Sequence, residues 1–483
     1  MVKISVHNDF ATFPADTPPE IVKRLDRLTA YEVEGKQYVE AFKKHYWDGK
    51  EHLIKLSRRL GCYQLPMGVL ADVVRAGLDV DFEDLRRRPS ERRALQWIGH
   101  EPRDYQRDAV AAALKDRGIL TGRGLLHLPI RAGKTLIAAK LIQETGLRTL
   151  FTVPSDLLLH QTVASFQESI ADAPVGLVGG GEWRPDWITV ATVQTLLARP
   201  EKASELLRGV DLLIMDEGHH LEAPEWRKPI LASDAFYKLG LSATIWINPE
   251  EESERGAIWL KAATGPILHK VSMKRLMDEG HLVPPIIDVY PIEKPDGFPA
   301  RASFAKAYKF LVAESEYRNS AIADLAEGAA IAGFRVLIDT GRLAQMTRLR
   351  EMLRARGFEC EAIHGKTPSK KRREILLEFR ANKIQILVGT ILGEGVDIPE
   401  LEVVINAEAM KSKTAVIQRM RNLTECAGKT RAHMIDFADA THPILARHSA
   451  ARLALYKGIR GFTVRSGKRD DGIQKFLFRV DAP

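Results

Sequence analysis

The chain has 483 residues, which is more than a single hydrophobic core normally serves and fits about three domains of roughly 150 residues each. Hydrophobic residues make up 45% and charged residues 28%, a globular balance that excludes general disorder. The formal net charge of +8 favours a polyanionic partner.

Two further classes are excluded by the sequence. The three cysteines, Cys62, Cys360 and Cys426, are odd in number and far apart, so neither a disulfide framework nor a CxxC metal site is expected. The first residues, "MVKISVHNDFATF", have no apolar signal core, and no run of about 20 apolar residues occurs. We expect a soluble, cytoplasmic protein, with a monomer as the simplest state.

The first hundred residues differ from the rest. The segment "HYWDGKEHLIKL" (His45 to Leu56) places an Asp-Gly turn among apolar and aromatic residues, which predicts a β-hairpin. The charge run "DFEDLRRRPSERR" that follows predicts a solvated junction. We expect residues 1–97 to form a small α+β domain.

The segment "LLHLPIRAGKTLIAAKLIQETG" predicts a phosphate-binding loop. An apolar strand leads into the Gly-Lys-Thr triplet and then into a helix that Gly146 ends. In such a loop Lys134 supplies charge to the β and γ phosphates of a nucleotide, and the Thr135 hydroxyl ligates Mg²⁺. Leu128 stands where the strict pattern has glycine. The triplet alone is common by chance, so the strand and helix around it carry the prediction.

The segment "LLIMDEGHHL" supplies a carboxylate pair at the end of a buried strand. We expect Asp216 to hold Mg²⁺ and Glu217 to orient and deprotonate the attacking water. By itself, the carboxylate pair would more simply be interpreted as a cap for the next helix. The phosphate-binding loop upstream favours a catalytic role instead. His219 and His220 lack a third ligand at a spacing that zinc needs, so a zinc site is rejected.

Short apolar runs alternate with helical patterns on both sides of the segment "HKVSMKRLMDEGHLVPP": "TLFTVP" (Thr149 to Pro154), "LLIMDE" (Leu212 to Glu217), "RVLIDT" (Arg335 to Thr340) and "QILVGT" (Gln385 to Thr390). This alternation predicts parallel sheets covered on both faces. We expect an α/β domain over residues 98–270, a linker over 271–290 with a helix that Gly280 ends, and a second α/β domain with a C-terminal tail over 291–483.

Several of these segments, in this order, resemble the motifs of superfamily 2 DExH helicases: "PIRAGKT", "DEGH", "LSATI", "IHGKTPSKKRREILLEF", "ILVGTILGEGVDIPELEVVI" and "IQRM". The resemblance covers nearly the whole chain and implies two tandem RecA-like domains that use ATP and Mg²⁺. With "EPRDYQRDAV" as the adenine-reading segment, the implied ATP ligands are Arg103, Tyr105, Gln106, Arg131, Ala132, Gly133, Lys134, Thr135, Gly395 and Asp397. The implied coupling residues are His219, Ser242, Ala243 and Thr244.

A finer resemblance concerns the first hundred residues. "HYWDGKEHLIKL" followed by "LPMGVLADVVRAGLDV" is similar to the N-terminal DNA-binding module of phage recombination and branch-migration helicases of the UvsW type, which are related to the XPB and RadD group. It implies branched DNA substrates: forks, D-loops and Holliday junctions.

The resemblance also implies DNA contacts from all three domains, although each residue taken singly fits an ordinary turn. The implied contacts are Trp47, Lys50, Pro154, Ser155, Thr192, Gln194, Thr340, Arg342, His364, Gly365 and Thr390. The basic residues from Lys366 to Arg373 form either a solvated helix face or an extension of this DNA track.

The arginine motif departs from the family. Its usual form near Gln418 is roughly Q-x-x-G-R-x-x-R, and its two arginines reach the γ-phosphate. Asn422 and Glu425 stand at those two positions here. Three functional interpretations stay open: Arg421 acts as the finger one residue early, Arg419 or a distant basic residue does so, or hydrolysis is slow and depends tightly on DNA. The alternative to all three is that Arg419 and Arg421 are only surface charge.

We therefore expect an ATP-dependent DNA helicase or translocase of replication, recombination or repair. Three rivals remain. A restriction-type nuclease would use the same motor, and Asp26, Glu34 and Lys36 loosely resemble its cleavage centre. A catalytically weak DNA-binding or remodelling protein would explain the altered arginine motif. An RNA helicase would share the motor motifs.

Overall fold

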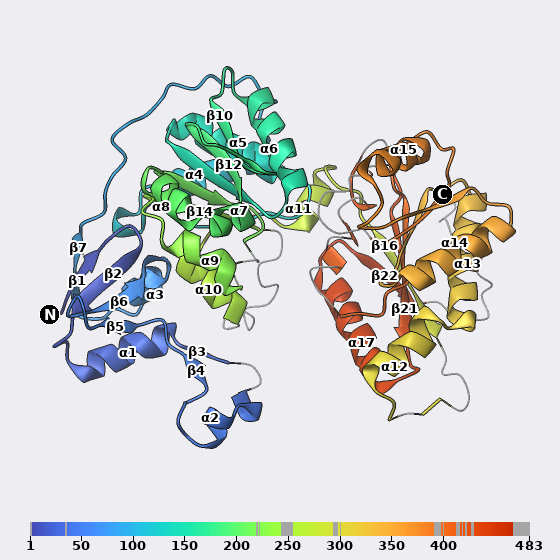
Figure 1. Cartoon of the computed structure of the whole chain (residues 1–483), viewed down its shortest axis with the longest axis horizontal. Helices are drawn as coiled ribbons and strands as arrows, with labels where there is room; N and C mark the ends of the chain where they lie inside the picture. The colour runs from blue at the N-terminus through green and yellow to red at the C-terminus, as the bar shows by residue number, and fades with distance from the viewer. Residues whose placement is uncertain are drawn as a thin grey trace. The chain divides into compact units, whose positions relative to one another are not determined.

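The computed structural model describes residues 2–33, 36–218, 221, 223–242, 255–292, 298–299, 301–390, 398, 400–411, 416–417, 419–420, 423–426 and 429–466. Contacts divide the chain into two compact units, Met1–Val271 and Ser272–Pro483 (Figure 1). No helix among the described residues is long and apolar enough to cross a membrane. All three cysteines are free thiols.

Unit 1 opens with a module built on a five-stranded sheet of order β5-β6-β2-β1-β7. Alternating apolar residues of β1 and β2 point inward, as in a sheet with one covered face, and pack on helix α1. The elements are β1 (Val2–Val6), β2 (Phe10–Pro14), α1 (Pro19–Thr29), β3 (Tyr31–Glu32), α2 (Glu40–Lys43), β4 (Lys50–Glu51), β5 (Lys55–Ser57), β6 (Cys62–Pro66), α3 (Leu70–Arg75) and β7 (Val80–Asp84).

The hairpin predicted around Asp48 and Gly49 is wrong. Strand β4 follows this turn but pairs with β3, and helix α2 occupies the place expected for the first hairpin strand. The hairpin of the module is β5–β6, which turns through Gly61 at φ +62°. Strand β4 pairs with Tyr31 and Glu32 rather than with the residues just before Asp48, and local sequence does not reveal this choice of partner.

Most of the charge run that begins in β7 is exposed, as predicted, but two of its arginines also make specific contacts. The Arg86 side chain is completely buried and donates to the Asp84 carboxylate and to the carbonyl oxygen of Thr121. Arg87 donates to Asp211 at 2.7 Å and to Asp234 at 3.1 Å. Thr121, Asp211 and Asp234 are far away in sequence, so the charge pattern alone does not reveal these contacts. The run ties the first module to the α/β part of unit 1.

The two parts of unit 1 also share a hydrophobic core. Trp259 of helix α10 packs among the residues of the first module, and its indole N–H donates to the Tyr31 hydroxyl at 2.6 Å. Lys261 on the same helix pairs with Asp72 at 2.7 Å. The first module is therefore built onto the α/β part.

The α/β part of unit 1 contains an eight-stranded sheet of order β11-β10-β12-β9-β13-β14-β8-β15, parallel except for β11, with helices on both faces (Figure 1). Its elements are α4 (Asp104–Leu114), β8 (Arg123–His127), α5 (Lys134–Thr145), β9 (Thr149–Val153), α6 (Asp156–Ser169), β10 (Val175–Gly179), β11 (Glu182–Arg184), β12 (Ile188–Thr192), α7 (Val193–Ala198), α8 (Pro200–Arg208), β13 (Leu212–Met215), α9 (Pro224–Leu231), β14 (Tyr237–Ser242), α10 (Arg255–Thr264) and β15 (Ile267–Lys270).

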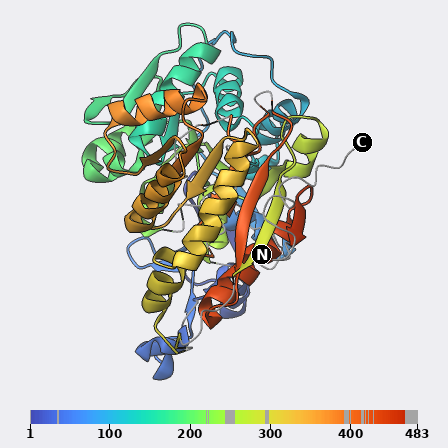
Figure 2. The same ribbon diagram turned by 90° about the vertical axis from the view of Figure 1, so that its right-hand side faces the viewer.

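Unit 2 contains a seven-stranded parallel sheet of order β18-β19-β17-β20-β21-β16-β22. Helix α13, yellow in Figure 2, lies along this sheet and shares its core. The elements are α11 (Met273–Asp278), β16 (Ile286–Ile292), α12 (Phe304–Tyr308), α13 (Glu316–Ile331), β17 (Val336–Asp339), α14 (Leu343–Ala355), β18 (Cys360–Ile363), α15 (Ser369–Arg380), β19 (Ile386–Gly389), β20 (Val403–Asn406), β21 (His433–Asp439), α17 (Pro443–Gly458) and β22 (Thr463–Ser466).

The expected α/β class with two parallel sheets is confirmed. Helix α11 forms as predicted and ends before Gly280, which has φ +73°. The expected linker over 271–290, however, contains the start of β16, which lies between β21 and β22. Its prolines suggested an extended link, and Pro285 stands just before the strand, where proline costs no ladder hydrogen bond.

Candidate nucleotide and nucleic-acid site

The predicted phosphate-binding loop joins β8 to α5. Its backbone is left-handed at Arg131 (φ +64°) and Gly133 (φ +75°), and α5 starts at Lys134. A Cβ atom at position 133 would lie 2.4 Å from Nε2 of Gln106, so a larger residue would have to displace the Gln106 amide and adopt a left-handed backbone that favours glycine. The free amides at the start of α5 make this loop an anion-binding helix end.

Helix α4 supports the loop from one side. Gln106 Nε2 donates to the carbonyl oxygen of Ala132 at 2.9 Å, and the Tyr105 hydroxyl donates to the same oxygen at 3.2 Å. The backbone N–H of Arg103 donates to Gln106 Oε1, and its guanidinium donates to the Tyr105 hydroxyl. Tyr105 is completely buried, so its ring holds the loop in place. Contact of these three residues with adenine stays a prediction.

The departure at Leu128 has a structural explanation. Leu128 is buried, and its N–H donates to the carbonyl oxygen of Ser242 at 3.0 Å. Leu128 is therefore still hydrogen-bonded to the sheet, and the phosphate-binding loop begins after it, one residue later than in the strict pattern. Ser242, a predicted coupling residue, is buried at the end of β14 and joined to the entry of the loop.

Lys134, Asp216 and Glu217 lie together at the carboxyl edge of the first sheet. Lys134 Nζ donates to Glu217 Oε1 at 2.5 Å and lies 3.9 Å from Asp216 Oδ1. Their side chains are 14%, 14% and 23% exposed in the order Lys134, Asp216, Glu217, so the charges are partly shielded from water.

Glu217 also has an unusual backbone. Its φ of +49° is left-handed, a conformation that costs a non-glycine residue about 1–3 kcal/mol. Its N–H donates to Asp216 Oδ1 at 3.0 Å, and the N–H of Asp216 donates to the carbonyl oxygen of Thr152 on β9. These bonds fix both carboxylates relative to Lys134.

The residues present fit a magnesium nucleotide. The Thr135 hydroxyl and the Asp216 carboxylate are oxygen donors of the kind that Mg²⁺ prefers, and Lys134 offers a cation to phosphate. Within the described part of the chain, no three His, Cys, Asp or Glu side chains form a metal-binding group.

The predicted DNA contacts of unit 1 lie side by side at the same sheet edge. Pro154 and Ser155 follow β9, and Thr192 and Gln194 lie at the end of the neighbouring β12. Gln194 Nε2 donates to the carbonyl oxygen of Pro154 at 3.1 Å and so joins the two segments. Ser155 caps α6, and the buried Thr192 bonds to Thr195, so both hydroxyls already serve the fold.

Three predicted DNA contacts of unit 2 also meet at one edge. Thr340, His364 and Thr390 directly follow β17, β18 and β19, which are adjacent and parallel. Position 365 follows at the same edge, and its carbonyl oxygen accepts from Arg372. The Arg342 guanidinium lies 5.4 Å from the centre of the Tyr308 ring. The edge offers hydroxyls and backbone groups that suit phosphate contacts.

Comparison with known proteins gives this arrangement a family. Residues 99–246 match the family described as "Type III restriction enzyme, res subunit", and residues 321–421 match "Helicase conserved C-terminal domain", together more than half of the chain. The "ATP-dependent DNA helicase uvsW" of Enterobacteria phage T4 is 22% identical over 91% of this chain and 91% of its own. The chain belongs to superfamily 2 of the helicases.

Two further proteins are similar to this helicase. "Putative helicase 22" of Sulfolobus islandicus filamentous virus is 26% identical over 74% of this chain and 68% of its own. The solved structure of S. cerevisiae Dbp5 bound to RNA and ADP BeF3 has a TM-score of 0.53 at 16% identity and covers 77% of this chain and 91% of that one. At this identity the second likeness shows the fold alone.

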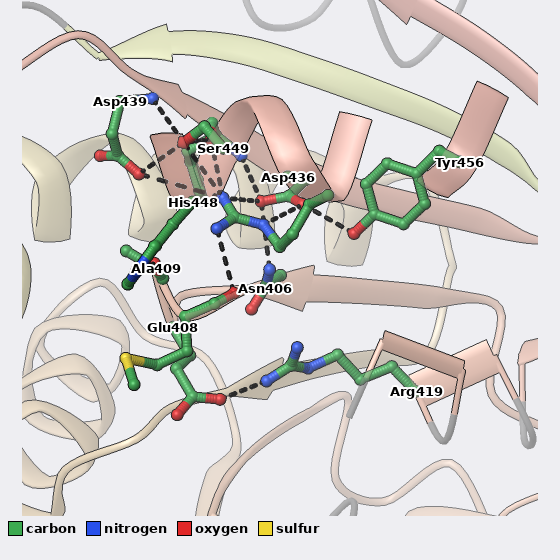
Figure 3. A network of polar contacts seen from close by, with 12 residues as sticks. Asn406, Glu408, Ala409, Arg419, Asp436, Asp439, His448, Ser449 and Tyr456 are labelled. Carbon is green, nitrogen blue, oxygen red and sulfur yellow. Dashed lines mark hydrogen bonds and ion pairs between the residues drawn. The ribbon is translucent and has the colours of Figure 1, made fainter. Parts of the chain in front are cut away.

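Arg419 of the helicase is held within unit 2. Its side chain is 3% exposed, its Nε donates to Asp339 Oδ2 at 2.5 Å, and its other end donates to Glu408 (Figure 3). Burial disfavours its charge, but the two carboxylates outweigh burial and raise its pKa. Its role as the finger stays a prediction.

A second buried network lies beside Arg419 and was missed by sequence reasoning (Figure 3). Arg452 donates to both oxygens of Asp436, at 2.9 and 3.0 Å, and the Tyr456 hydroxyl and the Asn406 amide donate to the same carboxylate. Burial raises the pKa of Asp436, but Arg452 and the Tyr456 hydroxyl together outweigh burial. The net effect is a lowered pKa. The only signal in the sequence was an aspartate inside the apolar run "HMIDFAD".

In the first module, Trp47 and Lys50 have structural contacts. The Trp47 indole N–H donates to the carbonyl oxygen of Lys50 at 2.7 Å, and its ring packs edge-on against Phe42 with centroids 6.4 Å apart. Trp47 is half-buried, so its ring is committed to the module. The DNA contact predicted for both residues stays a prediction.

Several predicted site residues lie outside the described residues. They are His219, Ala243, Thr244, Gly395, Asp397, Gln418 and Arg421, together with Asn422 of the arginine motif.

Proposed function

We propose that this helicase is an ATP-driven DNA translocase that acts on forks, D-loops and Holliday junctions in replication, recombination or repair. The proposal rests on the ion pair between Glu217 and Lys134, which lies at the start of α5 beside Asp216. The net charge of +8 suits a nucleic-acid partner, and the match to the phage T4 DNA helicase covers 91% of this chain.

Lys134 has one partner before nucleotide binds and another afterwards. In the described state its ammonium group is neutralised by Glu217. When ATP binds, the β and γ phosphates replace this carboxylate as the partner of Lys134, while Thr135 and Asp216 hold the Mg²⁺ that neutralises phosphate charge. Glu217 is then released to orient the attacking water and accept its proton.

The finger is assigned to Arg421 because Arg419 is bound within unit 2. Arg419 anchors its segment to the ends of β17 and β20 through Asp339 and Glu408. A segment anchored two residues before Arg421 limits the positions that this guanidinium can reach. Arginine fingers contribute roughly 10³ to 10⁵ in rate, so the assignment is testable by hydrolysis.

Movement along DNA follows from two separate sets of strand-end contacts. One set, in unit 1, consists of Pro154, Ser155, Thr192 and Gln194. The other set, in unit 2, consists of Thr340, Arg342, His364, Gly365 and Thr390. A nucleotide-driven change between the units would move one set relative to the other along a strand. Ser242, hydrogen-bonded to the entry of the phosphate loop, suits a coupling role.

The proposal is tested with synthetic forks and four-way junctions whose strands carry fluorophore and quencher. We expect ATP-dependent strand separation or branch migration on these substrates, with little activity on linear blunt duplex or on RNA of the same sequence. Equal activity on linear and branched DNA would contradict the branched substrate, and a preference for RNA would contradict the DNA assignment.

The motor of a restriction-type nuclease is the second candidate, favoured by the family description that residues 99–246 match. Its loose cleavage motif gains little support: Asp26 bonds to His52 at 2.7 Å, Lys36 pairs with Glu32 at 2.8 Å, and Glu34 lies outside the described residues. Mg²⁺-dependent cutting of DNA would favour this candidate.

A further inference from the structure

Helix α2 stands at the end of the short β3–β4 ribbon, away from the five-stranded sheet of its module (Figures 1 and 2). The last residue of α2, Lys43, and the three residues after it, Lys44, His45 and Tyr46, are all exposed. Tyr46 is 85% exposed, the largest exposure among the large hydrophobic residues that the structure describes. A single exposed apolar side chain is common on protein surfaces, but the backbone that carries this one is unusual.

The backbone here is a Schellman cap with an unusual side chain. The N–H of Tyr46 donates to the carbonyl oxygen of Ala41 at 2.8 Å, and the N–H of His45 donates to that of Phe42 at 3.0 Å. In this motif an apolar residue at the position of Tyr46 commonly packs back onto the last helical turn. Tyr46 does not, since its ring faces solvent.

The cap is also strained at His45. Its φ of +60° is left-handed, at the position where helices prefer glycine. The left-handed turn directs the chain after it outward, so Tyr46 lies at the tip of the segment formed by helix α2 and the β3–β4 ribbon, which we call the arm. Strain in a non-glycine residue persists where the surroundings hold it, and it often marks a functional position.

The surroundings do hold this turn. Phe42 and Trp47 pack edge to face, and the Trp47 indole N–H donates to the carbonyl oxygen of Lys50. Gly49 lies so close to Phe42 and Lys36 that a Cβ atom would meet both within 2.9 Å. The backbone that carries Tyr46 is therefore held by the packing of Phe42 before it and Trp47 after it.

We propose that Tyr46 stacks on an unpaired nucleobase where the strands of branched DNA separate, with Lys43 and Lys44 beside it facing the phosphates. The inference rests on the proposed function and adds the residue that recognises the branch. A flat ring beside two lysines suits single-stranded nucleic acid, because stacking accepts any base and lysines follow the backbone. Lys44 pairs with the exposed Glu40 at 3.0 Å in this structure, and phosphate would replace that carboxylate as its partner. It assigns to Tyr46 the contact that the sequence suggested for Trp47.

The test uses the full-length protein and a fork with 2-aminopurine at the branch point. Stacking of Tyr46 on this base would quench its fluorescence. We expect Tyr46→Ala to abolish the change and to weaken fork binding about 5- to 100-fold, the range for loss of one stacked base. Tyr46→Trp should restore both, because it keeps a large ring.

Two controls separate the arm from the motor. Tyr317→Ala removes another exposed tyrosine, on helix α13 of unit 2, and should leave the fork signal unchanged. ATP hydrolysis at saturating single-stranded DNA should equal that of wild type in Tyr46→Ala, since the ring contacts DNA and lies outside the nucleotide site. Unchanged fork binding and an unchanged 2-aminopurine signal in Tyr46→Ala would overturn the proposal while the motor stands. No DNA-stimulated hydrolysis in wild type would instead contradict the proposed function.

Discussion

Glu217 has two partners in the proposed cycle, Lys134 before ATP binds and water afterwards. We expect Glu217→Gln to lower the turnover of ATP hydrolysis at least 100-fold, about the lower limit for loss of a general base, while nucleotide binding is retained. The amide still accepts from Lys134 but takes up no proton. Steady-state hydrolysis and titration with a fluorescent ATP analogue measure the two effects. Glu182→Gln, which alters an exposed carboxylate paired with Arg184, is the control. Near-normal turnover in Glu217→Gln would contradict the assignment.

Gly133 is predicted to be irreplaceable for a steric reason. Gly133→Ala adds left-handed strain and brings a Cβ atom within 2.4 Å of Gln106 Nε2, so we expect loss of the Gln106–Ala132 hydrogen bond and at least tenfold weaker ATP binding. The matched control is Gly77→Ala, at φ +58° with nothing within 4 Å, which carries the strain without the clash. Equal ATP binding by both variants would show that the clash is relieved by movement of Gln106.

At the scale of elements, the sequence predicted best where local pattern decides structure. The strands β9, β13, β17 and β19 and helix α5 occur where apolar runs and the Gly146 stop placed them. The hairpin prediction was wrong because β4 pairs with β3, on the other side of helix α2 in the chain, and the contact of Arg87 with Asp211 was missed. Neither partner is marked by the local sequence.

The candidate site follows the same division. Lys134 and its carboxylate partners were predicted because strand ends and a helix start have local signatures. The tie between Arg419 and Glu408, and the Asp436 network, were missed because a buried ion pair is known only once the fold brings both charges together. An aspartate inside an apolar strand was the one sign that such a partner exists.

The Asp436 network predicts how unit 2 responds to acid. Its pKa is lowered in the folded state, so its contribution is present above the unfolded value of about 3.9 and is lost as the pH falls through the lower folded value. We expect the stability of unit 2 to be insensitive to Asp436 between about pH 5 and 8 and to decline below about pH 4.

Asp436→Asn tests this at the level of the unit. It leaves the buried Arg452 without a carboxylate, so we expect a loss of about 3–5 kcal/mol at neutral pH and a shallower decline in acid. All seven tryptophans lie within residues 1–271, so intrinsic fluorescence reports unit 1, and calorimetry compared with fluorescence isolates unit 2. An acid slope equal to wild type would show that Asp436 does not titrate as described.

At the scale of the whole molecule, the first module and the first α/β sheet form one unit rather than two domains on a flexible link. Trp259, Lys261 and Arg87 join them through a shared core and ion pairs. A DNA contact at Tyr46 therefore stands on the same body that holds the phosphate loop. This continuity gives the nucleotide-binding unit its own means of recognising DNA structure.

The central claim is that Lys134 makes this chain an ATP-driven motor on DNA. The most direct measurement is Mg²⁺-dependent ATP hydrolysis without nucleic acid, with single-stranded DNA and with branched DNA, in wild type, Lys134→Ala and Arg421→Ala. We predict hydrolysis that DNA stimulates in wild type and that both substitutions reduce by at least 100-fold. Wild-type protein that hydrolyses no ATP with any DNA, or Lys134→Ala that hydrolyses as fast as wild type, would contradict the account.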